Sequence, residues 1–150
     1  MHNLQQIIDE LLPAFPELSG KKIDLNYARL DSDTNLECGE YHIINRYWID
    51  VSEDLGEAPR DAIVGGLAHE LCHFVLGSTN TIRQGILYKI SKSYRTLVER
   101  NTDLEVIKRG FGLRLLALIL FNKNNDDDHD PEAGLSLEEL EGLLKNLRPG

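Results

Sequence analysis

Residues 59–77 read PRDAIVGGLAHELCHFVLG, the stretch with the clearest structural pattern in the chain. Apolar side chains recur four residues apart at Ile63, Leu67 and Leu71, which predicts an α-helix with one strongly buried face. Pro59 suits the first helical position, where a missing N–H costs nothing, and Gly77 suits the residue that ends the helix. Because small or apolar residues also flank the centre of the stretch, we expect the helix to lie inside the domain.

The residues before this helix predict a short helix followed by strands. Asn3–Leu12 has apolar residues at helical spacing, and the prolines that follow it end the helix. Lys22–Arg29 alternates apolar and polar residues, as a half-buried strand does. Tyr41–Val51 is richest in β-forming residues and predicts the best strand of the chain. Asp31–Glu40 is rich in turn formers, which suits either a hairpin connection or a short extra strand with a loop.

The residues after the central helix predict further helices. One covers part of Ile82–Tyr94, and another runs from about Thr96 to Phe121, with a bend near Gly110 and Gly112. The polar, acidic run 122–130 predicts an exposed loop. Ser136 and Glu139 form the sequence pattern of a capping box, which predicts a last amphipathic helix. The order of elements predicts a single α+β domain spanning residues 1–150.

Composition and charge restrict the kinds of partner that we expect. The chain has 150 residues, 41% of them hydrophobic, and a net charge of -9, which argues against a surface that binds nucleic acid. The longest apolar run, Leu115–Phe121, is too short to cross a bilayer, and no signal peptide is apparent. Cys38 and Cys72 are too few for a disulfide framework, so we expect reduced thiols in a cytoplasmic protein with no membrane partner.

The central helix also carries an H-E-x-x-H pattern, formed by His69, Glu70 and His73. Residues four apart lie one turn apart on the same helix face, so both imidazoles can bind one Zn²⁺. Glu70 is displaced around the helix from that face, so it is free to act as a general base on a water molecule. The pattern therefore predicts a zinc cofactor and a catalytic carboxylate next to it.

A third ligand has to come from elsewhere, because a catalytic zinc usually has three protein ligands and one open position. Glu99 is the candidate, on the next strongly helical segment. Asp103 lies one turn further along the same face, where a carboxylate can accept a hydrogen bond from the outer nitrogen of a histidine that binds the metal. Without the preceding motif, this pair would be interpreted as an ordinary solvated helix face.

The two motifs together resemble a known signature. H-E-x-x-H followed, after 25 residues, by E-x-x-x-D is similar to the pattern of the gluzincin metallopeptidases. The resemblance covers His69–Asp103 and implies the ligands and the base named above, with Asp103 as support for a histidine. It also implies a compact zincin-like fold, in which a small mixed sheet packs on the active-site helix and the C-terminal half is helical. Tyr41–Val51 would then border the cleft and pair with an extended peptide or protein substrate.

The sequence leaves the oxyanion-stabilising residue open. Larger gluzincins use a tyrosine or histidine opposite the zinc, and this chain offers several candidates: His42, Arg83, Tyr88, Tyr94 and Arg95. A metzincin pattern is excluded, because Leu76 stands where that signature needs glycine. A purely structural zinc is disfavoured, because such sites are usually closed by four ligands rich in cysteine. A zincin-like domain that has lost catalysis and regulates a protein partner remains the alternative.

Two other residues with metal-binding side chains are assigned structural or minor roles. Cys72 points away from the histidine face and is interpreted as a small buried side chain. His129 lies in an acidic run that weakly resembles a calcium loop, but Pro131 and Ala133 disrupt that pattern. Asp130 is better explained as a helix cap.

Overall fold

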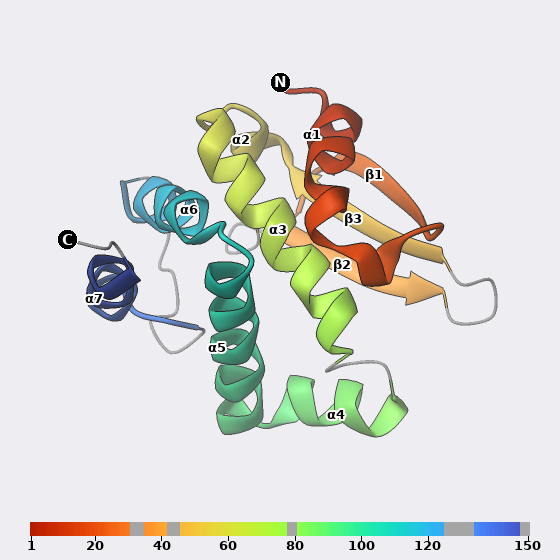
Figure 1. Cartoon of the computed structure of the whole chain (residues 1–150). Coiled ribbons are helices and arrows are strands. Elements are labelled where there is room, and N and C mark those ends of the chain that lie inside the picture. The colour runs from red at the N-terminus through yellow and green to blue at the C-terminus, as the bar shows by residue number, and fades with distance from the viewer. Residues whose placement is uncertain (31–34, 42–45, 78–80, 125–133, 148–150) are drawn as a thin grey trace.

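The computed structural model describes residues 1–30, 35–41, 46–77, 81–124 and 134–147. In chain order the elements are α1 (Leu4–Leu11), two 3-10 turns (Leu12–Ala14 and Pro16–Leu18), β1 (Lys22–Ala28), β2 (Leu36–Tyr41), β3 (Arg46–Ser52), α2 (Glu53–Gly56), α3 (Arg60–Leu76), α4 (Ile82–Ile90), α5 (Lys92–Lys108), α6 (Gly112–Asn124) and α7 (Leu137–Leu147). A small mixed sheet and a larger set of helices make this an α+β fold, which confirms the predicted class. Figure 1 shows α3 crossing the middle of the molecule, with the sheet and α1 on one side and α5, α6 and α7 on the other.

The sheet has three strands in the order β1-β3-β2. β1 pairs with β3 in parallel, with Leu25 opposite Ile49, and β2 pairs with β3 antiparallel, with Cys38 opposite Ile49. The prediction of one strand over Tyr41–Val51 is wrong, because Tyr41 ends β2 and Arg46 begins β3; residues 42–45 lie outside the described residues. The turn-rich segment 31–40 therefore contains most of an extra strand, which was one of its two interpretations.

The pairing also bears on the prediction that the strand over Tyr41–Val51 could pair with an extended peptide. β3 has a strand on each side, so its backbone groups are already paired and cannot accept an extended peptide. β2 is the edge strand that packs over α3, since Leu36 lies against Gly66 of that helix. Among the described strands, the sheet edge next to the central helix therefore belongs to β2.

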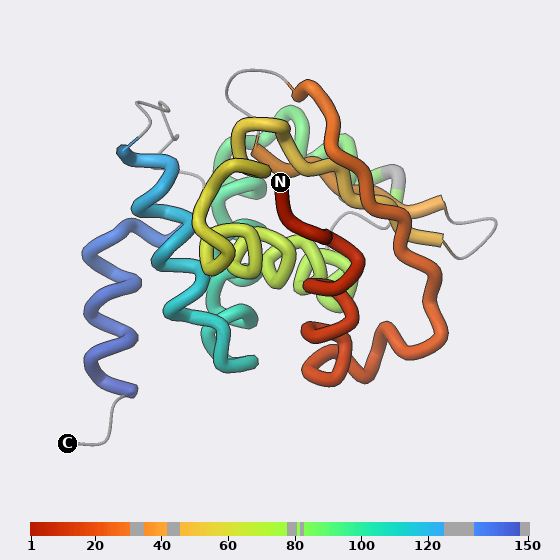
Figure 2. The backbone as a smooth tube through the Cα atoms, turned by 90° about the horizontal axis from the view of Figure 1, so that it is seen from above, coloured from red at the N-terminus to blue at the C-terminus, as the bar shows by residue number. Residues whose placement is uncertain are grey.

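α3 is buried along most of its length, including every residue from Ala62 to Ala68. The helix lies beneath the sheet and is also covered by α1 and α6, as Figure 2 shows from above. It ends at Gly77, which has a left-handed φ of 61° and donates its N–H to His73 O. Pro59 is the N-cap and Arg60 the first helical residue, one position later than predicted.

The helices after α3 are shorter and more separate than the sequence predicted. Ser91 ends α4 and caps α5, because its side chain accepts the N–H of Tyr94. The helix predicted from about Thr96 to Phe121 is two helices: α5 stops at Lys108, and the chain turns into α6 at Gly110, with φ +91°, where the sequence predicted a bend. The capping box of Ser136 and Glu139 is present at the start of α7.

The acidic run predicted as a loop is partly helical. α6 continues to Asn124, and Asn122 is buried and accepts a hydrogen bond from Asn35. The rest of that run, with His129, Asp130 and the calcium-like pattern, lies outside the described residues. Among the described helices, none is long and apolar enough to cross a membrane.

We predict that the close approach of α6 to α3 at Arg114 makes Gly65 intolerant of a side chain. A Cβ at Gly65 would lie 2.1 Å from the backbone oxygen of Arg114, whereas a Cβ at Gly66 would lie 2.8 Å from a flexible methyl group of Leu36. Gly65→Ala should cost about 3 kcal/mol of unfolding free energy or more, although alanine gains about 1 kcal/mol of helix propensity. Urea denaturation beside Gly66→Ala, expected to be much milder, measures the difference; equal stabilities would contradict this packing.

Candidate metal centre

α3 presents the two histidines of the motif to the same point. His69 and His73 are one turn apart, and their Nε2 atoms lie 3.0 Å from each other. The rings meet edge to face, with centroids 4.7 Å apart. Both side chains are largely buried, with 15% and 12% of their surface exposed. The four-residue spacing therefore brings both inner nitrogens together as predicted.

α5 adds a carboxylate at this point. Glu99 Oε2 lies 3.0 Å from His69 Nε2 and 3.5 Å from His73 Nε2. Glu99 is 8% exposed, so its charge is held away from bulk water. Among the described residues, His69, His73 and Glu99 are the one group of three side chains whose potential ligand atoms all lie close enough together to hold a metal ion.

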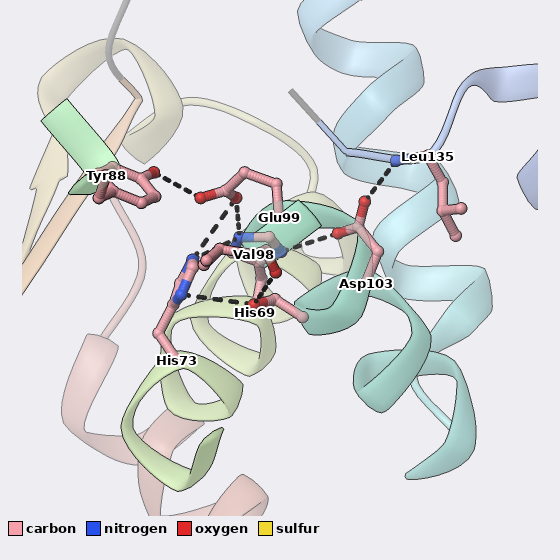
Figure 3. A network of polar contacts seen from close by, with 8 residues as sticks. His69, His73, Tyr88, Val98, Glu99, Asp103 and Leu135 are labelled. Atoms are coloured by element: carbon pink, nitrogen blue, oxygen red, sulfur yellow. Dashed lines mark hydrogen bonds and ion pairs between the residues drawn. The ribbon is translucent and has the colours of Figure 1, made fainter. Parts of the chain in front are cut away.

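The outer nitrogen of each histidine has its own partner. His69 Nδ1 lies 2.9 Å from Asp103 Oδ1, and an ionised carboxylate can only accept a hydrogen bond there. His73 Nδ1 lies 3.4 Å from Thr102 Oγ1. The Thr102 hydroxyl donates a hydrogen bond to Val98 O, so towards His73 it can only accept one. In the neutral form of both rings, the Nδ1 atoms therefore carry the protons, and the Nε2 atoms are left as acceptors. Figure 3 shows His69 and His73 in contact with Glu99.

The charges at this point are strongly coupled. Burial opposes a charge on His69, but hydrogen bonds to Asp103 and Glu99 outweigh it and raise the pKa of His69 well above its ordinary value. Burial alone would raise the pKa of Glu99, whereas the contacts with His69 and His73 hold it far below the usual range. The raised pKa of His69 and the lowered pKa of Glu99 have the same cause: a positive charge among these acceptors is stabilised.

Glu70 lies beside the cluster rather than in it. It is 7% exposed on α3, one residue from His69, and is not among the three converging side chains. Burial and the charges of Glu99 and Glu70 raise the pKa of the Tyr88 hydroxyl, and burial and the same two carboxylates raise the pKa of the Cys38 thiol. Tyr88 from α4 and Cys38 from β2 are thus neighbours of both carboxylates.

Tyr88 touches the cluster directly. Its hydroxyl donates to Glu99 Oε1 over 2.5 Å, which leaves Oε2 facing the histidines. Among the other candidates for an oxyanion-stabilising role, Arg95 lies near enough to Tyr88 for its charge to lower the pKa of that hydroxyl. His42 lies outside the described residues.

The two cysteines are not part of the cluster, and two groups that do contact it were not predicted from the sequence. Cys72 is fully buried in the core, where burial raises its pKa to about 12, and neither Cys72 nor Cys38 forms a disulfide. Thr102 was missed, although its position three residues after Glu99 on the same face is a signal that could have found it. The backbone N–H of Leu135, which donates to Asp103, has no side-chain signature in the sequence.

Comparison with known proteins gives no further guide to this site: no family model, no curated protein and no solved structure matches the chain.

Proposed function

We propose that the chain is a zinc-dependent hydrolase, a zincin-like metallopeptidase related in plan to the gluzincins. His69, His73 and Glu99 would hold the Zn²⁺, and Glu70 would be the general base. The observation that carries this proposal is the meeting of three acceptors, two Nε2 atoms and one carboxylate oxygen, within 3.0–3.5 Å of one another. Like acceptors repel unless a proton or a cation lies between them.

The donor set and its spacing fit zinc. Zn²⁺ binds imidazole nitrogen at about 2.0–2.1 Å, and two ligand atoms of a tetrahedral site therefore lie about 3.3 Å apart. The three separations of 3.0, 3.0 and 3.5 Å agree with that geometry. Two histidines and one carboxylate are a ligand set typical of catalytic zinc, because a fourth position stays open.

The outer contacts support the same assignment. A histidine that binds a metal donates its other N–H to a carboxylate, a carbonyl or water, which fixes the ring and its tautomer. Asp103, 2.9 Å from His69, is such a carboxylate, and the Thr102 hydroxyl, 3.4 Å from His73, would accept a hydrogen bond in the equivalent position. Tyr88 binds Glu99 Oε1, so a single oxygen of that carboxylate is directed at the metal position.

When bound, Zn²⁺ would polarise a substrate carbonyl and lower the pKa of water towards neutrality. Glu70, buried and adjacent to His69, would take a proton from the attacking water and pass it to the leaving amine. We assign Tyr88 to the support of Glu99 rather than of the developing oxyanion, because its one hydroxyl proton is already donated to Glu99 Oε1.

The substrate that this geometry favours is an extended peptide or protein segment. β2 is an edge strand, and its Cys38 lies within reach of the Glu70 and Glu99 charges. A peptide that adds to β2 as a further strand would be held by backbone hydrogen bonds on the strand that lies near these two carboxylates. This assigns to β2 the substrate-binding role that the sequence had given to the strand over Tyr41–Val51.

Metal removal and restoration test the proposal. The purified protein should contain about one zinc per chain by elemental analysis and should cleave members of a quenched-fluorescent peptide library. Treatment with 1,10-phenanthroline should abolish cleavage, and added Zn²⁺ should restore it. Zinc at about 1,000 times its Kd should also stabilise the fold by about 4 kcal/mol, which raises the melting temperature measurably. A protein without zinc, or one whose cleavage survives chelation, would overturn the assignment.

A further inference from the structure

The segment that leads into α7 reaches back to the metal centre. The N–H of Leu135 donates to Asp103 Oδ2 over 2.8 Å, while Oδ1 of the same carboxylate faces His69 Nδ1 at 2.9 Å. Asp103 is 4% exposed and Leu135 is 5% exposed, so this hydrogen bond is buried. Figure 3 shows Asp103 held between His69 on one side and the Leu135 backbone on the other.

The same segment is fastened to α5 at the turn that carries Glu99. Arg100 donates to Gly134 O over 3.3 Å and makes two contacts, at 2.9 and 2.8 Å, with the Glu139 carboxylate. Glu139 also accepts the N–H of Ser136, and Leu140 of α7 is fully buried. The start of α7 is therefore fixed to α5 by charge, by backbone hydrogen bonds and by apolar burial.

Gly134 is the residue that permits this close approach. Its φ is +113°, a backbone conformation that residues other than glycine rarely adopt. A Cβ at this position would lie 2.6 Å from Asp103 Oδ2 and 3.9 Å from the Glu99 Cβ. A larger residue would have to push either the carboxylate away from His69 or the segment away from α5.

We propose that Gly134 and the Leu135 N–H are positioning elements of the metal centre, so that docking of α7 and metal binding are coupled. This rests on the proposed zinc site. Asp103 orients His69 only while its second oxygen is held, and contacts of this outer kind typically change metal affinity 10–100-fold. Coupling between two equilibria is reciprocal. Bound zinc must therefore lower the equilibrium constant for release of the segment that leads into α7 by the same factor.

A pair of glycine variants tests the coupling. Gly134→Ala in the full chain should weaken zinc binding about 10–100-fold, measured by competition with a chromophoric chelator. The visible spectrum of the Co²⁺-substituted variant should also change, because the orientation of His69 changes. Gly142→Ala is the matched control, since a Cβ there meets no atom within 4 Å and the residue lies on α7 itself. Zinc affinity and a Co²⁺ spectrum equal to those of the control would overturn the proposal.

A measurement on the unaltered protein covers the case in which Gly134→Ala fails to fold. Amide hydrogen exchange at Leu135 and along the first turn of α7 should slow about 10–100-fold when Zn²⁺ is added. An unchanged exchange rate in zinc-loaded protein overturns the coupling and leaves the hydrolase proposal standing. Protein that binds zinc and shows the slower exchange, yet cleaves no peptide, overturns the hydrolase proposal and leaves the coupling standing.

Discussion

Glu70→Gln is expected to keep zinc bound and to lower the rate of peptide hydrolysis by about 10²–10⁴-fold. Glutamine has nearly the size of glutamate, so the packing of a side chain that is 7% exposed is preserved. It cannot take a proton from water, which is the step assigned to Glu70. The ligand atoms of His69, His73 and Glu99 are unchanged, so zinc content by elemental analysis should remain close to one per chain.

The control for this variant is Glu57→Gln, which removes a carboxylate whose side chain is 73% exposed and lies outside the cluster. Its turnover of the same quenched-fluorescent peptides should equal that of the unaltered protein. If Glu70→Gln keeps full turnover, Glu70 is not the base. If it instead loses zinc, Glu70 belongs to the metal-binding set. If the zinc-loaded unaltered protein and the zinc-loaded Glu57→Gln variant both lack turnover, a regulatory domain that acts through a protein partner is favoured.

The part of this site that the sequence predicted depends on helix periodicity. His69 and His73 meet because positions four apart always share a helix face, and the same rule aligns Glu99 with Asp103 on α5. That Glu99 reaches the histidines depends on how α5 packs against α3. Periodicity carries no information on that packing, so only the resemblance to a known signature predicted it.

The parts that the sequence did not predict depend on long-range pairing or on backbone groups. β3 is central because β1 pairs with it in parallel, a choice that alternating residues in Arg46–Ser52 do not encode. Tyr88 was one of five candidates for the oxyanion role, and its contact with Glu99 instead follows from the position of α4, which Ser91 joins to α5. The Leu135 N–H is a backbone group that every residue except proline has, so no sequence pattern could have identified its role.

Glu99→Ala is expected to produce the largest loss of metal. Structural zinc sites with four ligands bind with about 10–16 kcal/mol, so one ligand contributes about 2.5–4 kcal/mol, or about 10²–10³-fold in Kd. Removal of Glu99 also removes the charge that the two Nε2 atoms face at 3.0 and 3.5 Å. Competition with a chromophoric chelator at fixed pH measures the Kd, and circular dichroism checks that the helices remain.

Tyr88→Phe tests how much the tyrosine hydroxyl that supports Glu99 contributes to zinc affinity, apart from Glu99 itself. Phenylalanine keeps the ring but removes the hydroxyl that binds Glu99 Oε1, while Oε2 still faces the histidines. We therefore expect its zinc affinity to fall by about tenfold, in the range of a supporting contact and well short of the Glu99→Ala loss. Zinc affinity in Glu99→Ala equal to that of Tyr88→Phe would remove Glu99 from the ligand set, because a true ligand must cost more than the group that orients it.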